Sequence, residues 1–159
     1  MHRVYLSLGS NWGRREEWLR KAERLLNEGG VYVIGRSSIY RTPPTGFRFQ
    51  PSFLNLVIVA QTVLTPGEVL DTVKSIERRI GRIRLFPNSP RRIDIDLLFY
   101  NNTVMSTTTL TLPHPKMHKR AFVLLPLSGI APGLRHPVSG KTVLNMLANV
   151  DTKGLERWR

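Results

Sequence analysis

Two aspartates spaced two residues apart are the side chains whose pattern most directly suggests chemistry. Asp94 and Asp96 alternate with apolar residues in the segment IDIDLLFY, 93–100. This alternation predicts a strand on which both carboxylates point to one face, about 7 Å apart. The other face of the strand would belong to the core and would carry Ile93, Ile95, Leu97 and Phe99.

Two like charges side by side on a strand repel each other, so something must compensate them. One candidate is Mg²⁺, which binds carboxylate oxygens together with phosphate oxygens and water. Two such ions bracket a polyphosphate in many enzymes. The alternative is a solvated strand face on which Asp94 and Asp96 pair with nearby arginines.

An arginine-rich segment directly precedes the aspartates. It contains six arginines and no acidic residue, at Arg78, Arg79, Arg82, Arg84, Arg91 and Arg92. Planar guanidinium groups bind phosphates in a forked geometry. A carboxylate pair that binds metal, joined to such a segment, is the combination that a nucleoside triphosphate requires.

A second basic segment, HPKMHKRAF, runs from His114 to Phe122. A histidine at a turn and an arginine six residues later, His114 and Arg120, can both reach a phosphate. The alternative is a solvated basic helix end. His118 and His136 are interpreted as ordinary surface histidines. The tetrapeptide SGKT at 139–142 is not a P-loop, because Arg135 stands where the required glycine would be.

The composition sets the limits for these motifs. The chain has 159 residues, no cysteine, 24 Lys and Arg, 11 Asp and Glu, and a net charge of +13. Disulfides and thiolate metal sites are therefore excluded, and the expected compartment is the cytoplasm. No apolar run is long enough to span a membrane. The charge indicates an anionic partner: nucleic acid, an anionic membrane or a small polyphosphate.

Hydrophobic periodicity predicts elements that alternate between strands and helices. We expect strands at 4–8, 31–40, 53–62 and 93–100 and helices at 13–28 and 65–81, with Thr65 as the cap of the second. We also expect a short helix within 114–127 that ends near Pro126, irregular structure at 131–140, and a final helical turn at 143–149.

This order is the split βαβ pattern of ferredoxin-like folds. The predicted class is α+β, with a ferredoxin-like βαββαβ core in which helices pack on an antiparallel sheet in three layers. No repeat, linker or low-complexity segment interrupts the sequence, so residues 1–159 are expected to form a single domain.

Five segments, taken together, resemble one enzyme family. They are YLSLGSN (5–11), SSIYRTPPTG (37–46), FLNLVIV (53–59), PRRIDIDLLFYNN (90–102) and LTLPHPKMHKRAFVLLPLSGIAP (110–132). Their order and spacing are similar to those of the 6-hydroxymethyl-7,8-dihydropterin pyrophosphokinases of folate biosynthesis. The combination of R-x-x-D-x-D with P-H-P-x-M-x-x-R-x-F carries most of the resemblance.

The resemblance implies transfer of the diphosphoryl group of ATP to the pterin hydroxymethyl oxygen, with release of AMP. It implies two Mg²⁺ ions held by Asp94 and Asp96, and charge neutralisation by Arg82 or Arg91. Residues that would serve ATP are Glu77, Arg84, Arg91, Leu97, Thr111, His114 and Arg120. Residues that would bind the pterin are Thr42, Pro43, Pro44, Thr45, Phe53, Asn55 and Phe122.

The chemistry of these residue types agrees with a pterin. Its flat ring needs aromatic partners such as Phe53 and Phe122. Its amide-like edge needs paired donors and acceptors, which the carboxamide of Asn55 offers. Since Asn55 sits in an apolar strand, we expect the ligand to be its hydrogen-bond partner. Without the family, all three would be interpreted as ordinary core residues.

Some positions depart from the family pattern. Asn88 stands where well-known members have tryptophan, Lys74 where they have glutamine, and Pro115 where they have tyrosine. The loops at 43–52 and 81–92 are candidate lids over the site.

Two other functions remain as alternatives. A basic ferredoxin-like RNA-binding module fits the charge, but 53–60 lacks the aromatic strand motif of such modules. Another metal-dependent nucleotidyl or phosphoryl transferase fits the aspartates but not the predicted pterin pocket. With the pterin kinase preferred, we expect no specific nucleic acid partner, no membrane and a monomer.

Overall fold

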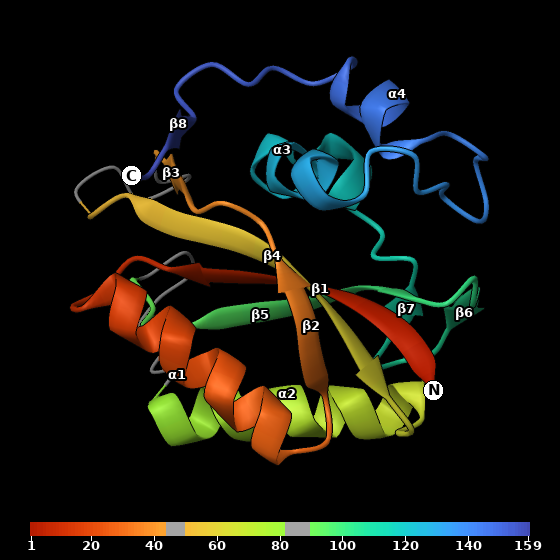
Figure 1. The fold of residues 1–159 in the computed structure, drawn as a ribbon, viewed down its shortest axis with the longest axis horizontal. Coiled ribbons are helices and arrows are strands. Elements are labelled where there is room, and N and C mark those ends of the chain that lie inside the picture. Colours follow the sequence, from red (N-terminus) through yellow and green to blue (C-terminus); the bar gives the residue numbers. More distant parts are fainter. Residues whose placement is uncertain (44–49, 82–89) are drawn as a thin grey trace.

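A computed structural model describes residues 1–43, 50–81 and 90–159. Its centre is an antiparallel sheet in the order β5-β1-β4-β3-β8, and β2 also pairs with β4 (Figure 1). The strands of this sheet are β1 (His2–Ser10), β2 (Tyr32–Arg36), β3 (Tyr40–Thr42), β4 (Phe53–Thr62), β5 (Asp94–Tyr100) and β8 (Glu156–Arg157). The predictions for Pro44, Thr45, Arg82, Arg84 and Asn88 lie outside the described residues.

The strand order confirms the split βαβ arrangement. β1 lies between β4 and β5 although it comes first in the chain, and α1 and α2 make the two crossovers. β1 pairs with β4 along its whole length, from His2 opposite Thr62 to Ser10 opposite Leu54. β1 and β4 therefore form the centre of the sheet, and the site residues are placed by their register with these two strands.

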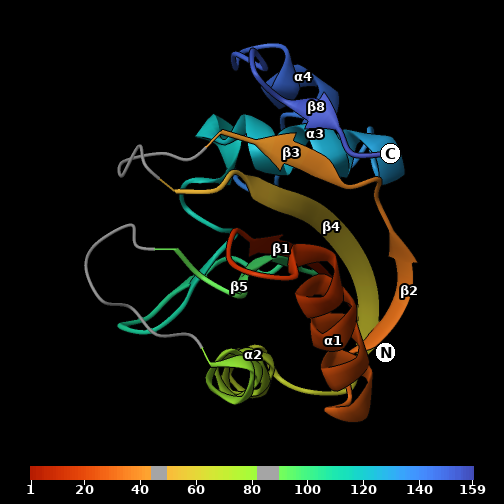
Figure 2. The same cartoon turned by 90° about the vertical axis from the view of Figure 1, so that its left-hand side faces the viewer.

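Helices cover both faces of the sheet, as Figures 1 and 2 show. On one face lie α1 (Arg15–Glu28) and α2 (Pro66–Ile80). On the other lie η1 (Met117–Lys119), α3 (Ala121–Ile130) and α4 (Val143–Leu147). This is the predicted three-layer arrangement.

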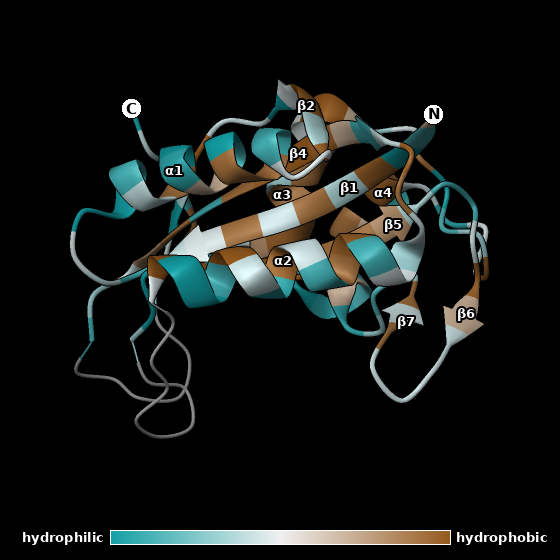
Figure 3. Ribbon diagram, turned by 90° about the horizontal axis from the view of Figure 1, so that it is seen from below, coloured by the Kyte–Doolittle hydropathy of each residue, from teal (hydrophilic) through white to brown (hydrophobic). Residues whose placement is uncertain are grey.

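Each face has its own apolar cluster. The larger one joins α1 and α2 to residues such as Leu6, Ile58 and Ile95. The second joins α3 and α4 to Val57 and Leu98. Because the central strands are buried on both sides, they are apolar along most of their length instead of alternating. In Figure 3, hydrophilic and hydrophobic residues alternate along α1 and α2, as expected of helices that cover a sheet with one face.

The second helix begins and ends as its sequence predicts. The Thr65 hydroxyl accepts a hydrogen bond from the Glu68 backbone N–H, and the Glu68 carboxylate accepts one from the Thr65 N–H. Gly81 ends the helix with φ +91°, a left-handed conformation that glycine adopts without strain. The Thr65 cap therefore fixes where α2 begins, and Gly81 fixes where the chain leaves α2 on its way to β5.

Three of the predicted elements are wrong in detail. The expected strand at 31–40 is divided into β2 and β3, with Ser37 between them exchanging hydrogen bonds with Val57. Pro126 does not end a helix but lies inside α3. It is buried, as are Val123 and Leu127, so apolar burial offsets the lost backbone hydrogen bond.

The alternation of β5 fails at Phe99. Ile93, Ile95 and Leu97 belong to the α1 and α2 side, as predicted, but Phe99 belongs to the α3 side. A shift in the pairing with β1, between Tyr5 and Leu6, inserts an extra residue in β5. Such a bulge moves every following side chain to the opposite face.

Three short elements have no counterpart in the predictions: β8 and the hairpin of β6 (Met105–Ser106) and β7 (Thr111–Leu112). The irregular stretch at 131–140 and the helical turn that follows agree with expectation. Within residues 1–43, 50–81 and 90–159, no helix has the length and apolarity that crossing a membrane requires.

Candidate active site

The strand register brings the predicted site residues into rows across the sheet. Gly9 of β1 lies opposite Asn55 of β4 on one side and opposite Asp94 of β5 on the other. Two residues along each strand, Ser7 lies opposite Asp96. Residues that are distant in the sequence therefore meet on one face, beyond the N-terminal end of α3.

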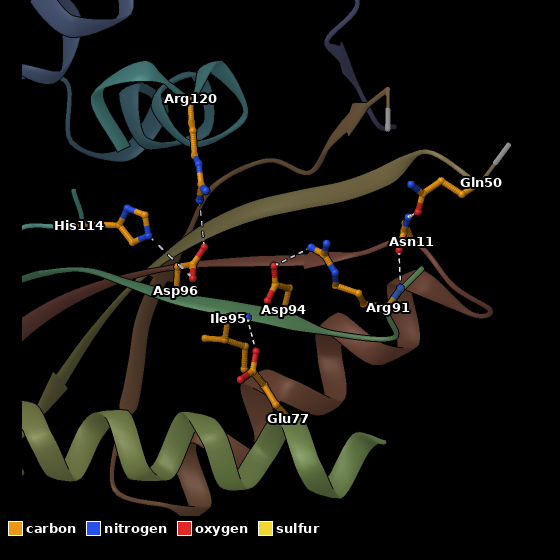
Figure 4. A network of polar contacts seen from close by, with 9 residues as sticks. All are labelled: Asn11, Gln50, Glu77, Arg91, Asp94, Ile95, Asp96, His114 and Arg120. Carbon is orange, nitrogen blue, oxygen red and sulfur yellow. Dashed lines mark hydrogen bonds and ion pairs between the residues drawn. The ribbon is translucent and has the colours of Figure 1, made fainter. Parts of the chain in front are cut away.

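Each aspartate is paired with an arginine (Figure 4). Arg91 Nη1 donates to Asp94 Oδ2 at 3.1 Å, and Arg120 Nη1 donates to Asp96 Oδ2 at 3.4 Å. The carboxylate side chains are 26% and 35% exposed, so both pairs are open to solvent and to ligand. The repulsion expected between the aspartates is thus compensated by guanidinium groups in the free protein.

The same two arginines cover the two predicted pterin aromatics. The guanidinium of Arg91 lies 5.6 Å from the ring centre of Phe53, and that of Arg120 lies 5.5 Å from the ring centre of Phe122. Cations over aromatic faces attract the ring electrons. Each guanidinium therefore connects one carboxylate with one ring.

His114 is a second neighbour of Asp96, in addition to Arg120 (Figure 4). Its Nε2 lies 4.0 Å from Asp96 Oδ1, and its Nδ1 accepts a hydrogen bond from the Lys116 backbone N–H. Burial, followed by the positive charge of Arg120, lowers the pKa of His114 to about 4. The ring is therefore neutral at pH 7, with its proton on Nε2, and it does not form an ion pair with Asp96.

Glu77 holds β5 in place from α2. β5 is the edge strand of the sheet, and the Glu77 Oε2 accepts a hydrogen bond from the Ile95 backbone N–H at 3.1 Å. Glu77 is buried, at 7% exposure. Because Ile95 lies between Asp94 and Asp96, this bond fixes the strand segment that presents both carboxylates.

Asn11 joins the segments on the two sides of the site. It is fully buried, its Oδ1 accepts from the Arg91 backbone N–H at 2.7 Å, and its own N–H donates to the Arg91 carbonyl. Its Nδ2 donates to Gln50 Oε1 at 2.7 Å (Figure 4). It also donates to the Pro51 carbonyl at 3.3 Å. One side chain therefore fixes the chain before β4 and the chain before β5.

The Asn55 amide is held by the protein. It is buried, and its Nδ2 donates to the Thr42 Oγ1 at 2.7 Å. Gly9 leaves room for it, since a Cβ at Gly9 would lie only 2.7 Å from Asn55 Oδ1. The expectation that the ligand is the partner of Asn55 is incomplete, because a threonine already orients the amide. Its role toward pterin stays a prediction.

Two adjoining hollows meet at Asp96. The first is lined by Ser7, Gly9, Thr42, Pro43, Phe53, Asn55, Arg91, Asp94, Asp96, Arg120 and Phe122. The second is lined by Leu70, Ile95, Asp96, Leu97, Thr107, Thr108, Thr109, Leu110, Thr111, His114 and Pro115. The first gathers the described residues that were predicted for pterin, and the second gathers Leu97, Thr111 and His114, which were predicted for ATP.

Not every basic residue before β5 points to this site. Arg92 turns away, donates to the Ile80 carbonyl and covers the ring of Trp18 at 5.3 Å. Conversely, Ser7, Gly9 and Asn11 belong to the site but were not singled out. They lie in the YLSLGSN segment, where two glycine or asparagine residues at the end of an apolar strand were the available signal.

The carboxylate pair fits a cation that takes few ligands from the protein. Among the described residues, no group of three or more histidine, aspartate or glutamate side chains is arranged to hold a metal ion. Mg²⁺ commonly binds one or two carboxylates and completes its shell with phosphate and water. Asp94, which lines the first hollow, and Asp96, which lines both, suit that ion when a polyphosphate is present.

Similarity to known proteins agrees with this geometry. Residues 5–132 match the family model of 7,8-dihydro-6-hydroxymethylpterin-pyrophosphokinase. The 2-amino-4-hydroxy-6-hydroxymethyldihydropteridine pyrophosphokinase of Methylorubrum extorquens is 45% identical, over 99% of this chain and 99% of that protein. The enzyme of the same name from Bacillus subtilis is 36% identical, over 98% of this chain and 90% of that protein.

Longer proteins share the fold. A crystal structure of the Plasmodium falciparum HPPK-DHPS wild type superposes with a TM-score of 0.75 at 17% identity, and this chain spans 48% of its length. The folic acid synthesis protein of Pneumocystis carinii is 36% identical, and this chain spans 20% of it. From the match over residues 5–132 and the full-length bacterial relatives, the chain belongs to the 7,8-dihydro-6-hydroxymethylpterin-pyrophosphokinase family.

Proposed function

We propose that this chain transfers the diphosphoryl group of ATP to the hydroxymethyl oxygen of 6-hydroxymethyl-7,8-dihydropterin and releases AMP. The observation that carries the proposal is the pair of hollows that share Asp96. One offers aromatic rings and a buried amide for a flat heterocycle, and the other offers a neutral histidine and threonines for a nucleotide. A group passing from one ligand to the other would cross at the aspartates.

On the pterin side, the proposed roles follow from the contacts. The rings of Phe53 and Phe122 would stack against the pterin, and the fixed amide of Asn55 would bond its polar edge. Thr42 would act by orienting that amide. Pro43 lines the same hollow, and Pro44 and Thr45 complete the proposed set from the sequence.

On the nucleotide side, His114 would donate from Nε2 to a phosphate oxygen without adding charge, because its ring is neutral. Arg91 and Arg120 would exchange their aspartate partners for phosphate oxygens, with Arg82 and Arg84 proposed to join them. Leu97 and Thr111 would contact the nucleotide from the second hollow. Glu77 would act chiefly by holding β5.

Asp94 and Asp96 would hold Mg²⁺, and we propose two ions. When bound, they would supply neutralisation of phosphate charge and polarisation of the bridging oxygens. The contribution of the chain itself is to hold the pterin hydroxyl in line with the β-phosphorus and to keep water out, since positioning and charge stabilisation supply most of the catalysis of phosphoryl transfer.

We further propose that residues 1–159 act as one domain and as a monomer in the cytoplasm, without a nucleic acid partner. The support for the absence of a nucleic acid partner is that the +13 charge has an anionic substrate to serve. Sedimentation at micromolar concentration tests the monomer.

The test of the activity is a coupled assay for AMP formed from ATP and Mg²⁺, with and without the hydroxymethyl pterin. Pterin-dependent AMP is expected. ATP hydrolysis that ignores the pterin would contradict the proposal. RNA binding with no pterin-dependent AMP would favour the basic RNA-binding module instead.

A further inference from the structure

We infer that Trp158, with the 154–158 segment that carries it, is a positioning residue for the pterin side of the active site. The inference rests on the proposed function, because it concerns how the pterin hollow keeps its shape. This segment lies outside residues 5–132, the span that matches the family model. It folds back over the edge of the sheet next to β3 (Figure 1).

The segment first completes β3. That strand has only three residues, of which Tyr40 and Arg41 pair with Arg157 and Glu156 of β8. The Arg41 guanidinium also donates to the Glu156 carboxylate at 3.0 Å. A strand this short has little stability of its own, so pairing on its second edge stabilises it. β3 ends at Thr42, the residue that orients Asn55.

Trp158 continues this contact and adds a second one. Its backbone N–H donates to the Ile39 carbonyl at 2.8 Å, directly before β3. Its indole Nε1–H donates to the Glu16 carboxylate of α1 at 2.7 Å, and its ring packs partly buried against the main core cluster. The tryptophan therefore ties the edge of the sheet to the first helix.

From Trp158 the contacts lead to the start of β4. The Arg15 guanidinium lies 5.3 Å from the indole ring centre. Its Nη1 donates to the Ser52 carbonyl at 2.9 Å and to the Ser52 hydroxyl at 3.2 Å. Ser52 directly precedes Phe53, which lines the pterin hollow. The indole thus supports the arginine that holds the chain just before this aromatic ring.

The turn before β8 reaches the hollow from the other direction. Gly154 has φ +87°, and a Cβ there would lie 3.2 Å from Pro43 Cγ. The turn therefore packs closely on Pro43, which lines the pterin hollow. Thr42, Pro43 and Phe53 are all supported by one folded-back segment, and this is why we place its effect on pterin and not on nucleotide.

The experiment compares Trp158→Ala, Trp158→Phe and Lys153→Ala, the last an exposed control just before the segment. For Trp158→Ala we expect the KM for pterin to rise about tenfold or more, with the KM for ATP and kcat at saturating pterin within about twofold. Trp158→Phe keeps an aromatic ring over Arg15 and should recover part of the loss. Lys153→Ala should match the unsubstituted chain.

Equal increases in the KM for both substrates, or an unchanged KM for pterin in a folded Trp158→Ala variant, would overturn the inference. Should that variant not fold, Glu16→Ala against Glu16→Gln gives the same test, because glutamine still accepts the indole hydrogen bond. Equilibrium dialysis of pterin separates the two proposals. Pterin binding that is weakened by these variants, in a chain that makes no AMP, would contradict only the proposed reaction.

Discussion

The pterin side and the phosphate side of the site are built in different ways. On the pterin side, Thr42 and Asn55 are 7% and 4% exposed and already bonded to each other at 2.7 Å. On the phosphate side, Asp94 and Asp96 are 26% and 35% exposed and are paired with Arg91 and Arg120. The groups proposed to recognise the ring are thus already fixed in the free protein, whereas the proposed recognition of charge requires the ion pairs to change partners.

This difference has a physical reason. A neutral amide costs little to bury once it has a hydrogen-bond partner, so it can be fixed in advance. Two carboxylates and their arginines would be costly to bury, and they lie near solvent, where we propose that phosphate and metal replace the pairs. Variants on the pterin side should therefore change the binding of one ligand, while variants on the phosphate side should change the reaction itself.

The largest effect is expected for Asp96→Asn, which keeps the shape of the side chain and removes the charge shared by both hollows. We expect kcat/KM to fall by roughly a thousandfold or more, because a preorganised charge at the reacting phosphates is lost. AMP formation measures this. Asp71→Asn, an exposed change on α2, is the control. A near-native kcat in Asp96→Asn would contradict a metal-binding role for this residue.

The next effect should fall on one ligand only. Asn55→Ala removes the buried amide and leaves the Thr42 hydroxyl without its partner. We expect pterin affinity to fall by about tenfold to a hundredfold, corresponding to roughly 1.5–3 kcal/mol, with ATP affinity unchanged. Calorimetric titration with pterin and with a non-hydrolysable ATP analogue provides the measurement. Similar losses for both ligands would argue against the division of the site, and Asn102→Ala, at an exposed position, serves as control.

A change at the junction should affect both sides moderately. Asn11→Ala leaves the part-buried Arg91 N–H and the Gln50 amide oxygen without the Asn11 partner. We expect a loss of about 1–3 kcal/mol in the free energy of unfolding, together with weaker binding of both ligands. Urea unfolding measures the first and titration the second. If only pterin binding weakened, Asn11 would belong to the pterin side rather than join the two sides.

Much of this arrangement could be predicted because it depends on local signals. The bounds of β4 follow from a long apolar run that is buried on both faces, and α2 follows from its Thr65 and Glu68 caps. The Asp94 and Asp96 pair was visible because acids are scarce in this chain. These features need only neighbours along the sequence, together with the resemblance to the family.

Other features depend on parts of the chain that are distant in sequence. The bulge that turns Phe99 to the α3 side arises from the pairing of β5 with β1, and no pattern within β5 announces it. The strand β8 exists because β3 is beside it. Likewise, the role of Asn11 becomes visible only when Gln50 and Arg91 are brought to it. Tertiary pairing outweighed local propensity in each case.

A further predicted effect concerns proton binding on the phosphate side. His114 is buried beside Arg120, and its pKa of about 4 lies below the ordinary value of 6.5. As the pH falls from about 6.5 toward 4, the unfolded chain binds a proton at this histidine while the folded chain does not. The free energy of unfolding should therefore decrease over this range.

In His114→Asn, whose side-chain oxygen can still accept from the Lys116 N–H, the decrease should be smaller. Urea midpoints measured in EDTA without nucleotide give the comparison, with the exposed His118→Asn as control. Identical pH slopes for His114→Asn and the unsubstituted chain would show that the free phosphate side does not hold this ring neutral.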